Sequence, residues 1–245
     1  MLSAASPTPM QGCTAKRLCA MSSLTAKAWL GVVSLAAVMG FLLFLPAGTA
    51  QYWQAWVFLA VFFGASSLIT LYLLKEDPAL LQRRLRGGPT AEKRGMQRVI
   101  MFFASLGFIG LLVVPALGHR FGWSAVPLPI VVVGDVLVAA GMYLTFLVYR
   151  ENPFTSATIE VAQDQEVIST GPYARVRHPM YVGGLTLLLG MSPALGSYWG
   201  LVVFAAMAPV LVWRLLDEER FLSKDLPGYT EYRAKVRWRL IPGLF

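Results

Sequence analysis

The chain passes from a polar connector into an apolar segment within one stretch, Val167-Ile-Ser-Thr-Gly-Pro-Tyr-Ala-Arg-Val-Arg-His-Pro-Met-Tyr-Val-Gly-Gly184. Gly171-Pro172 is a turn signal in its polar half. Pro179 suits the first position of a helix, because its missing N–H would have no partner there in any case. The stretch therefore predicts a loop, a turn and an apolar helix that begins at Pro179.

The predicted start of this helix lies among cationic side chains. The backbone N–H groups of residues 180–182 have no helical partner in a first turn, and Arg175, Arg177 and His178 lie just before them. A helix N-terminus with basic neighbours favours an anionic group. The alternative is a membrane helix that follows an ordinary basic flank, and these local features alone do not separate the two.

The composition places the chain among membrane proteins. Of its 245 residues, 56% are hydrophobic and only 14% are charged, which is too apolar for an ordinary soluble domain. The net charge of +8 fits loops that lie against anionic lipids, and no basic soluble domain for nucleic-acid binding is apparent. Cys13 and Cys19 form no disulfide framework. We expect free thiols there, with reversible acylation as the alternative.

Six apolar segments organise the chain. The first four, at 28–45, 52–74, 99–117 and 126–149, are each long enough to cross a hydrocarbon core of about 30 Å. The next two, 180–193 and 198–216, flank a tight turn and predict a helical hairpin whose first helix is short for a span.

The predicted fold class is all-α, a polytopic integral-membrane helical bundle with about five to six transmembrane helices. We expect residues 1–27 to form a disordered tail and residues 28–150 a four-helix membrane region. Residues 151–245 would hold the hairpin, a cytoplasmic pocket and a C-terminal lid.

The positive charges predict the orientation. Of the 21 lysines and arginines, 20 lie in the N-terminal tail, in the two polar connections or in residues 214–245, and only Arg120 lies on the other side. The positive-inside rule therefore predicts that both termini and both polar connections are cytoplasmic. In a bacterium this would be the inner membrane.

A second polar cluster ends the last apolar segment, in the sequence Arg214-Leu-Leu-Asp-Glu-Glu219. Arg214 and Glu218 share one helix face, whereas Glu219 lies about 100° further round. An exposed ion pair contributes roughly 0.3–0.5 kcal/mol, so stability alone gives little reason for so dense a cluster. Because the predicted topology brings it to the same side as His178, we favour a functional site over a solvated charge cluster.

Three other polar features have plain structural interpretations. Asp135 lies in the middle of an apolar segment, where we favour a buried hydrogen bond with a group such as Ser or Thr over a catalytic role. The connection 75–98 predicts a surface helix that ends at Gly87-Gly88. Residues 229–242 predict an amphipathic helix at the membrane surface, with a lid over the cytoplasmic site as the alternative.

Several motifs are absent from the sequence. There is no Gly-x-Gly-x-x-Gly, no P-loop and no Gly-x-Ser-x-Gly elbow. The two histidines, His119 and His178, fall on opposite sides in the predicted topology, so we expect no histidine-rich metal centre.

The stretch 167–183 resembles a motif of the isoprenylcysteine carboxyl methyltransferase family, which belongs with the phospholipid N-methyltransferases among integral-membrane methyltransferases. The resemblance covers roughly residues 150–245 and departs at Leu226-Pro227-Gly228, where a Phe-Gly pair is usual. This departure leaves the lid and the size of the substrate open. The further matching residues are Arg214, Glu218-Glu219, Leu222, Tyr229, Tyr232 and Ile241-Pro242.

The resemblance implies that S-adenosyl-L-methionine binds at the cytoplasmic face, within a methyltransferase region at 151–245. Carried over position by position, the cofactor-binding residues are Gln165, Glu166, Val167, Ile168, Tyr173, His178, Pro179, Met180, Tyr181 and Glu218. The expected catalytic residues are Arg214, which would hold the acceptor, together with Glu218 and Glu219. Glu219 would take the proton of an amine or thiol acceptor, whereas a carboxylate acceptor needs no base.

We expect a lipophilic acceptor, with an isoprenylcysteine-like carboxylate first and a phospholipid amine or a small thiol as alternatives. Membrane lipids are expected contacts, and neither nucleic acid nor an obligate protein partner is expected. A non-enzymatic lipid-binding or transport module is the competing hypothesis from a different class. A sterol-reductase-like enzyme with a nicotinamide cofactor is a third.

Overall fold

The computed structural model describes residues 9–85, 95–155 and 165–245, and within these ranges it is built from helices without strands. This confirms the predicted all-α class. The α-helices are α1 (Pro9–Ala47), α2 (Trp53–Glu76), α3 (Pro78–Leu85), α4 (Gly95–Phe121), α5 (Leu128–Glu151), α6 (Pro179–Ala194), α7 (Trp199–Asp225) and α8 (Tyr229–Lys235), and one 3-10 helix, η1, covers Gly171–Ala174.

Five of the described helices are long and apolar enough to cross a membrane: α1 from Met21 onward, α2, α4, α5 and α7. Their outer faces carry exposed apolar side chains such as Leu30, Trp56 and Phe102, as expected where lipid is the solvent. The chain is therefore an integral membrane protein. Helix α6 has 16 residues, so it is about 24 Å long and shorter than a hydrocarbon core. This agrees with the short first helix expected of the hairpin.

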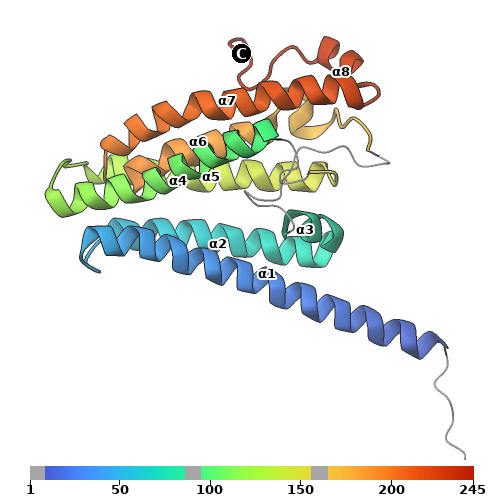
Figure 1. Cartoon of the computed structure of the whole chain (residues 1–245), viewed down its shortest axis with the longest axis horizontal. Coiled ribbons are helices and arrows are strands. Elements are labelled where there is room, and N and C mark those ends of the chain that lie inside the picture. The colour runs from blue at the N-terminus through green and yellow to red at the C-terminus, as the bar shows by residue number, and fades with distance from the viewer. Residues whose placement is uncertain (1–8, 86–94, 156–164) are drawn as a thin grey trace, which may run out of the picture.

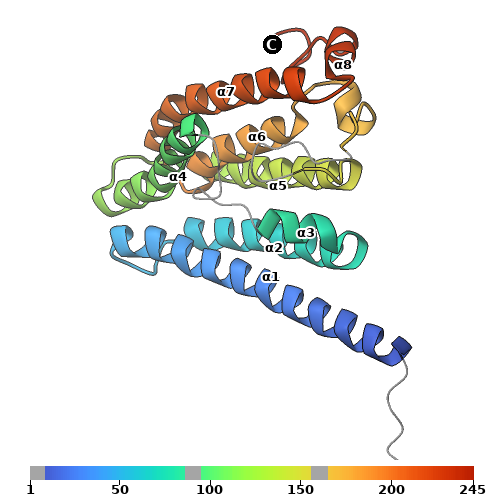
Figure 2. The same ribbon diagram turned by 45° about the vertical axis from the view of Figure 1, so that its right-hand side comes forward.

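The long helices run back and forth in layers (Figure 1). Helices α1 and α2 form one layer, and α4, α5, α6 and α7 lie above it in both views (Figures 1 and 2). The short turns at 48–52, 122–127 and 195–198 lie at one end, which we call the turn end. Helices α3 and α8 and the 3-10 helix lie at the other, the loop end. The topology thus gathers the polar segments at one end.

Glycines allow α5 and α6 to pack backbone to backbone. A Cβ atom at Gly134 would lie 2.2 Å from the amide nitrogen of Ala194, and one at Gly141 would lie 2.5 Å from that of Leu187. On α6, a Cβ atom at Gly190 would lie 2.7 Å from the carbonyl oxygen of Gly134. Small residues are what lets two helices approach this closely in a membrane. The close approach fixes α6, and hence the loop at its start, against the end of α5.

Helix α1 begins earlier than the sequence predicted. It starts at Pro9, within the tail that we expected to be disordered through residue 27. Among its described side chains, Leu24 packs against a buried cluster of Ala28, Leu73, Leu80 and Leu81, which joins this part of α1 to α2 and α3. Helix α3 is the expected surface helix of the second connection, and Gly87-Gly88 lies outside the described residues.

The hydrogen bond that we expected for Asp135 within the bundle is not found at its Oδ1 atom. Its Oδ1 atom is buried and has no hydrogen bond from any described residue, so the predicted bond from Ser or Thr is not formed there. At the turn end, the fully buried Tyr52 donates its hydroxyl to the carbonyl oxygen of Leu195 at 2.5 Å and stacks on the ring of His119. Tyr52 thereby fixes the turn between α6 and α7.

Candidate active site

The loop before α6 folds as its sequence predicts. Gly171 has a φ of 55°, a left-handed conformation that favours glycine, and it begins the 3-10 helix. The backbone leaves the helical region again at His178, and α6 starts at Pro179. The turn and the proline therefore deliver His178, which is 4% exposed, into the interior of the loop end.

The start of α6 is not the open anion site that we expected. The amides of Tyr181 and Val182 both donate to the carbonyl oxygen of His178, at 3.0 and 3.3 Å, because residue 178 caps the first turn through its backbone. Arg175 is exposed, and Arg177 is paired with a carboxylate. The expectation of free amides ringed by cations is therefore wrong at these positions.

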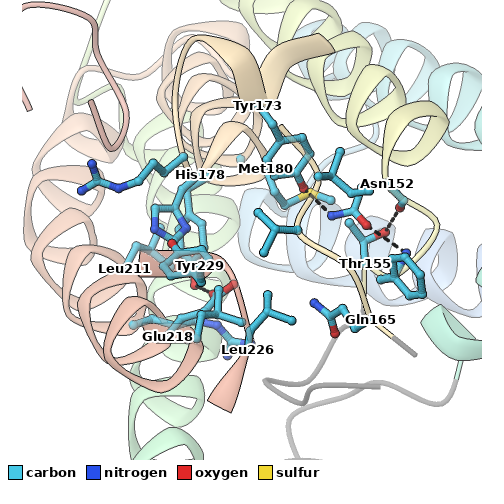
Figure 3. Close-up of a pocket in the computed structure, with 18 of the residues that line it drawn as sticks. Asn152, Thr155, Gln165, Tyr173, His178, Met180, Leu211, Glu218, Leu226 and Tyr229 are labelled. Carbon is cyan, nitrogen blue, oxygen red and sulfur yellow. Dashed lines mark hydrogen bonds between the residues drawn. The ribbon is translucent and has the colours of Figure 1, made fainter. Parts of the chain in front are cut away.

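A cavity of about 600 Å³ opens at the loop end between the start of α6 and the end of α7. Figure 3 shows Glu218, Leu226 and Tyr229 on one side of this space and Asn152, Thr155 and Gln165 on the other. One part of the wall is apolar, formed by Met101 and Ala104 of α4, Leu185 and Leu188 of α6, and Leu211 of α7. The cavity is thus polar in one part and apolar where it enters the bundle.

Most of the predicted site residues line this cavity. They are Gln165, Glu166, Val167, Ile168, Tyr173, His178, Met180, Tyr181, Arg214 and Glu218. Two predicted residues do not line it: Pro179, which is buried at the first position of α6, and Glu219. The two motifs that the sequence placed on one side of the membrane therefore enclose one space.

Three consecutive carboxylates at the end of α7 contact three different elements. Asp217 accepts a hydrogen bond from the fully buried Gln97 of α4. Glu218 accepts one from the hydroxyl of Tyr181 on α6, at 2.6 Å. Glu219 accepts from the guanidinium groups of Arg177 and Arg239, at 2.6 and 2.7 Å. Of the three, Glu218 alone lines the cavity.

Glu219 is not placed to act as a base. Both of its oxygens accept bonds from arginine side chains, it is 3% exposed, and it lies outside the cavity wall. The expectation that it takes a proton from an amine or thiol acceptor therefore disagrees with this geometry. The 100° step between neighbouring helical residues turns Glu219 toward the loop while Glu218 faces the cavity.

Among the buried side-chain atoms of the wall, His178 Nε2 and the hydroxyl of Tyr229 have no hydrogen bond from the described part of the chain. Both side chains are at most 4% exposed. A buried polar group without a partner is costly, which is why such atoms point to a ligand that supplies the bond. His178 and Tyr229 therefore mark the polar part of the cavity as a binding surface.

Tyr173 contributes a neutral phenol to the same wall. Burial raises its pKa to about 12, with a smaller raising contribution from the charge of Glu218. Its hydroxyl accepts a bond from Asn152 at 3.0 Å, and its carbonyl oxygen accepts one from Tyr232 at 2.7 Å. Tyr173 therefore stays protonated near neutral pH and links α5 to α8.

Sequence reasoning missed several residues of the wall. Arg84 of α3 lines the cavity, with its guanidinium carbon 5.1 Å from the centre of the Tyr149 ring. Asn152 follows the last turn of α5. The matching sequence motifs begin after both residues. The predicted topology places residues 75–98 on this side of the membrane, but it does not bring α3 to the cavity. The helix at 78–85 was predicted, but its role at the cavity had no sequence signal.

Comparison with known proteins identifies the architecture. Residues 129–227 match the model of the phospholipid methyltransferase family. This range holds α6, α7 and all of α5 except its first residue, and these helices carry much of the cavity wall. Over these residues the chain is similar to the phospholipid methyltransferase family. The resemblance noted from the sequence motifs is thereby confirmed.

Two curated proteins are similar to this chain. The cobalt-zinc-cadmium resistance protein CzcN of Cupriavidus metallidurans is 29% identical over 165 residues, which are 65% of this chain and 68% of that protein. The delta(14)-sterol reductase TM7SF2 of Mus musculus is 31% identical over 108 residues, which are 40% of this chain. The match spans only 25% of the reductase.

Within the described residues, no group of three or more His, Cys, Asp or Glu side chains is arranged to hold a metal ion.

Proposed function

We propose that this chain transfers a methyl group from S-adenosylmethionine to a lipophilic acceptor. The observation that carries the proposal is the composition of one cavity wall, which joins the carboxylate of Glu218 and two unpartnered buried polar atoms to an apolar end inside the bundle. The volume of about 600 Å³ lies within the range of small-molecule sites. A donor and part of an acceptor have room there together.

The residues present fit this donor. S-adenosylmethionine supplies an electrophilic methyl group on a sulfonium cation. Glu218, held by Tyr181, offers a negative charge to that cation, and His178 and Tyr229 offer polar atoms to the rest of the molecule. Methyl transfer needs alignment of two reactants and exclusion of water, and no covalent intermediate with the protein. The chain's own residues then have to bind the donor and the acceptor and orient them toward each other.

The geometry favours a carboxylate as the acceptor group. The carboxylates in the described cavity wall are Glu166, which is exposed, and Glu218, which is bonded to Tyr181. With Glu219 engaged by two arginines, an amine or thiol acceptor would need Glu218 or His178 as its base, and the proposal assigns both of these residues to the donor. A carboxylate is already a nucleophile and needs none. An isoprenylcysteine-like carboxylate, oriented by Arg214, therefore fits better than a phospholipid amine or a small thiol.

We also infer that the loop end faces the cytoplasm, because nearly all lysines and arginines belong to segments at that end. The test uses single cysteines at Arg237 and Arg120 in a chain without Cys13 and Cys19. An impermeant maleimide added to intact cells should label R120C and spare R237C. The reverse pattern would overturn this orientation.

Incubation of membranes that contain the chain with a methyl-labelled donor tests the activity. We expect label in a lipid-soluble product that loses it on mild alkaline hydrolysis, as a methyl ester does. An alkali-stable label would favour an amine or thiol acceptor. Absence of label above membranes without the chain would favour a non-enzymatic lipid-binding module.

The similarity to a sterol reductase supports one second candidate. A reductase would bind a reduced nicotinamide cofactor in place of S-adenosylmethionine. Titration of purified protein with each molecule separates the two, since we expect saturable binding of the methyl donor only.

A further inference from the structure

A buried ion cluster lies beside the cavity. The carboxylate of Glu219 accepts bonds from Nε of Arg177 at 2.6 Å and from Nε of Arg239 at 2.7 Å. The side chains of Glu219 and Arg177 are at most 5% exposed, and that of Arg239 is 27% exposed. Arg177 and Arg239 come from segments far apart in the chain, so Glu219 joins the loop before α6 to the residues after α8.

The same residues are joined through their backbones. The amides of Arg177 and His178 donate to the carbonyl oxygens of Trp238 and Arg239, at 2.9 and 3.0 Å. Nη1 of Arg177 donates to the carbonyl oxygens of Val236 and Arg237, at 2.8 and 2.7 Å. Residues 236–239 therefore form a clasp that holds two consecutive residues of the cavity wall.

The clasp acts where a ligand would bind. Arg177 and His178 both line the cavity, and Nε2 of His178 lies 3.9 Å from Oε1 of Glu219. Burying charged groups is a poor route to stability, because their desolvation offsets most of the attraction between them. What such a cluster does supply is a single arrangement of the groups it joins, here the backbone and ring of His178.

We propose that Glu219 and Arg239 are positioning residues for the methyl donor, acting through the clasp on Arg177 and His178. This inference rests on the proposed function. It gives Glu219 a role that needs its charge but no contact with a substrate. It also gives the C-terminal segment a part in donor binding, although residues 236–239 do not themselves line the cavity.

The chain offers a matched pair of variants. R239A removes one of the two bonds to Glu219, whereas R237A removes the same charge from the same segment at an exposed side chain whose carbonyl is kept. Hydrogen exchange of the peptide that contains residues 177 and 178 reports the clasp directly. We expect faster exchange there in R239A and parent-like exchange in R237A. Parent-like exchange in R239A would overturn the clasp.

Calorimetry with S-adenosylmethionine, well below the melting temperature of each variant, then tests positioning. We expect the Kd of R239A to rise about tenfold with unchanged stoichiometry, because a charged hydrogen bond that orders the site is lost. R237A should stay within about twofold, and R239K, which keeps the charge but loses the Nε donor and the guanidinium contact with the Phe245 ring, should recover part of the affinity. A merely structural role predicts fewer binding sites at an unchanged Kd, and that result would overturn the proposal.

The two proposals fail in different ways. No donor binding by the parent protein overturns the proposed function and, with it, the positioning role, while the exchange experiment still decides whether the clasp exists. Donor binding by the parent together with an unchanged Kd in an R239A whose clasp has opened overturns the positioning role alone.

Discussion

The hydroxyl of Tyr181 donates to Oε2 of Glu218 across 2.6 Å, which joins the first turn of α6 to the end of α7 in the wall of the cavity. The tyrosine belongs to the His-Pro-Met-Tyr motif and the glutamate to the Arg-x-x-x-Glu-Glu motif. The two sequence motifs therefore meet through a direct contact between side chains.

Removal of this contact should weaken donor binding. In Tyr181→Phe, the carboxylate of Glu218 loses the group that orients it, and we expect the Kd for S-adenosylmethionine to rise about tenfold. Calorimetry on the detergent-purified variant measures this. An unchanged Kd would show that the orientation of Glu218 is irrelevant to the donor.

Loss of charge at the two neighbouring glutamates should affect different properties: stability at Glu219 and donor binding at Glu218. Glu219→Gln leaves the buried guanidinium of Arg177 without its counter-charge, which we expect to cost about 3–5 kcal/mol of stability. Glu218→Gln should change the melting temperature little and abolish most donor binding. Thermal unfolding and calorimetry on both variants check the contrast, and equal melting temperatures would contradict it.

Much of the fold can be predicted from the sequence, because the length of each apolar segment and the charges at its ends determine where a membrane helix forms. Each of the six apolar segments forms one helix, although α1 begins earlier, at Pro9, and α7 continues further, to Asp225. Pro179 begins α6, a position where its missing N–H has no cost. The early start of α1 was missed, and within its described part Leu24 packs against a buried cluster that includes Leu80 and Leu81 of α3. Such contacts have no signal in a single sequence.

The sequence predicted that the two motifs meet at one site. It did not predict which of the two neighbouring glutamates faces the cavity. Helical geometry separates Glu218 from Glu219 by about 100°, yet it does not say which of them faces the cavity. That choice depends on Arg239, which follows the last helix and reaches back to Glu219. Arg84 was missed for the same reason, since α3 reaches the cavity only in the folded chain.

Arg84 should affect the acceptor more than the donor. Helix α3 lies outside the region that matches the methyltransferase family, and its Arg84 brings a cation to the cavity wall. For Arg84→Ala we expect a KM for an anionic acceptor about three- to tenfold higher, with an unchanged Kd for the donor. Arg220→Ala, at an exposed position on α7, is the charge-matched control and should leave both constants unchanged. A raised donor Kd in Arg84→Ala would place α3 on the donor side instead.

The glycine packing of α5 on α6 should tolerate no side chain. In Gly141→Ala, the added methyl would lie 2.5 Å from the amide nitrogen of Leu187, so the helices must separate. We expect a loss of about 1–3 kcal/mol or more and a lower melting temperature. Gly40→Ala on α1, where no atom lies within 4 Å of the added methyl, is the control and should be neutral or slightly stabilising. Similar melting temperatures for the two variants would show that α5 and α6 do not pack this closely.

The central claim is that the cavity at the loop end binds a sulfonium methyl donor. Equilibrium titration of the purified chain with S-adenosylmethionine, with His178→Ala and Asp135→Asn as comparison variants, tests it most directly. The account predicts one saturable site in the parent protein and in Asp135→Asn, competition by S-adenosylhomocysteine, and loss of binding in His178→Ala. No saturable binding by the parent, or equal binding by the parent and His178→Ala, would contradict it.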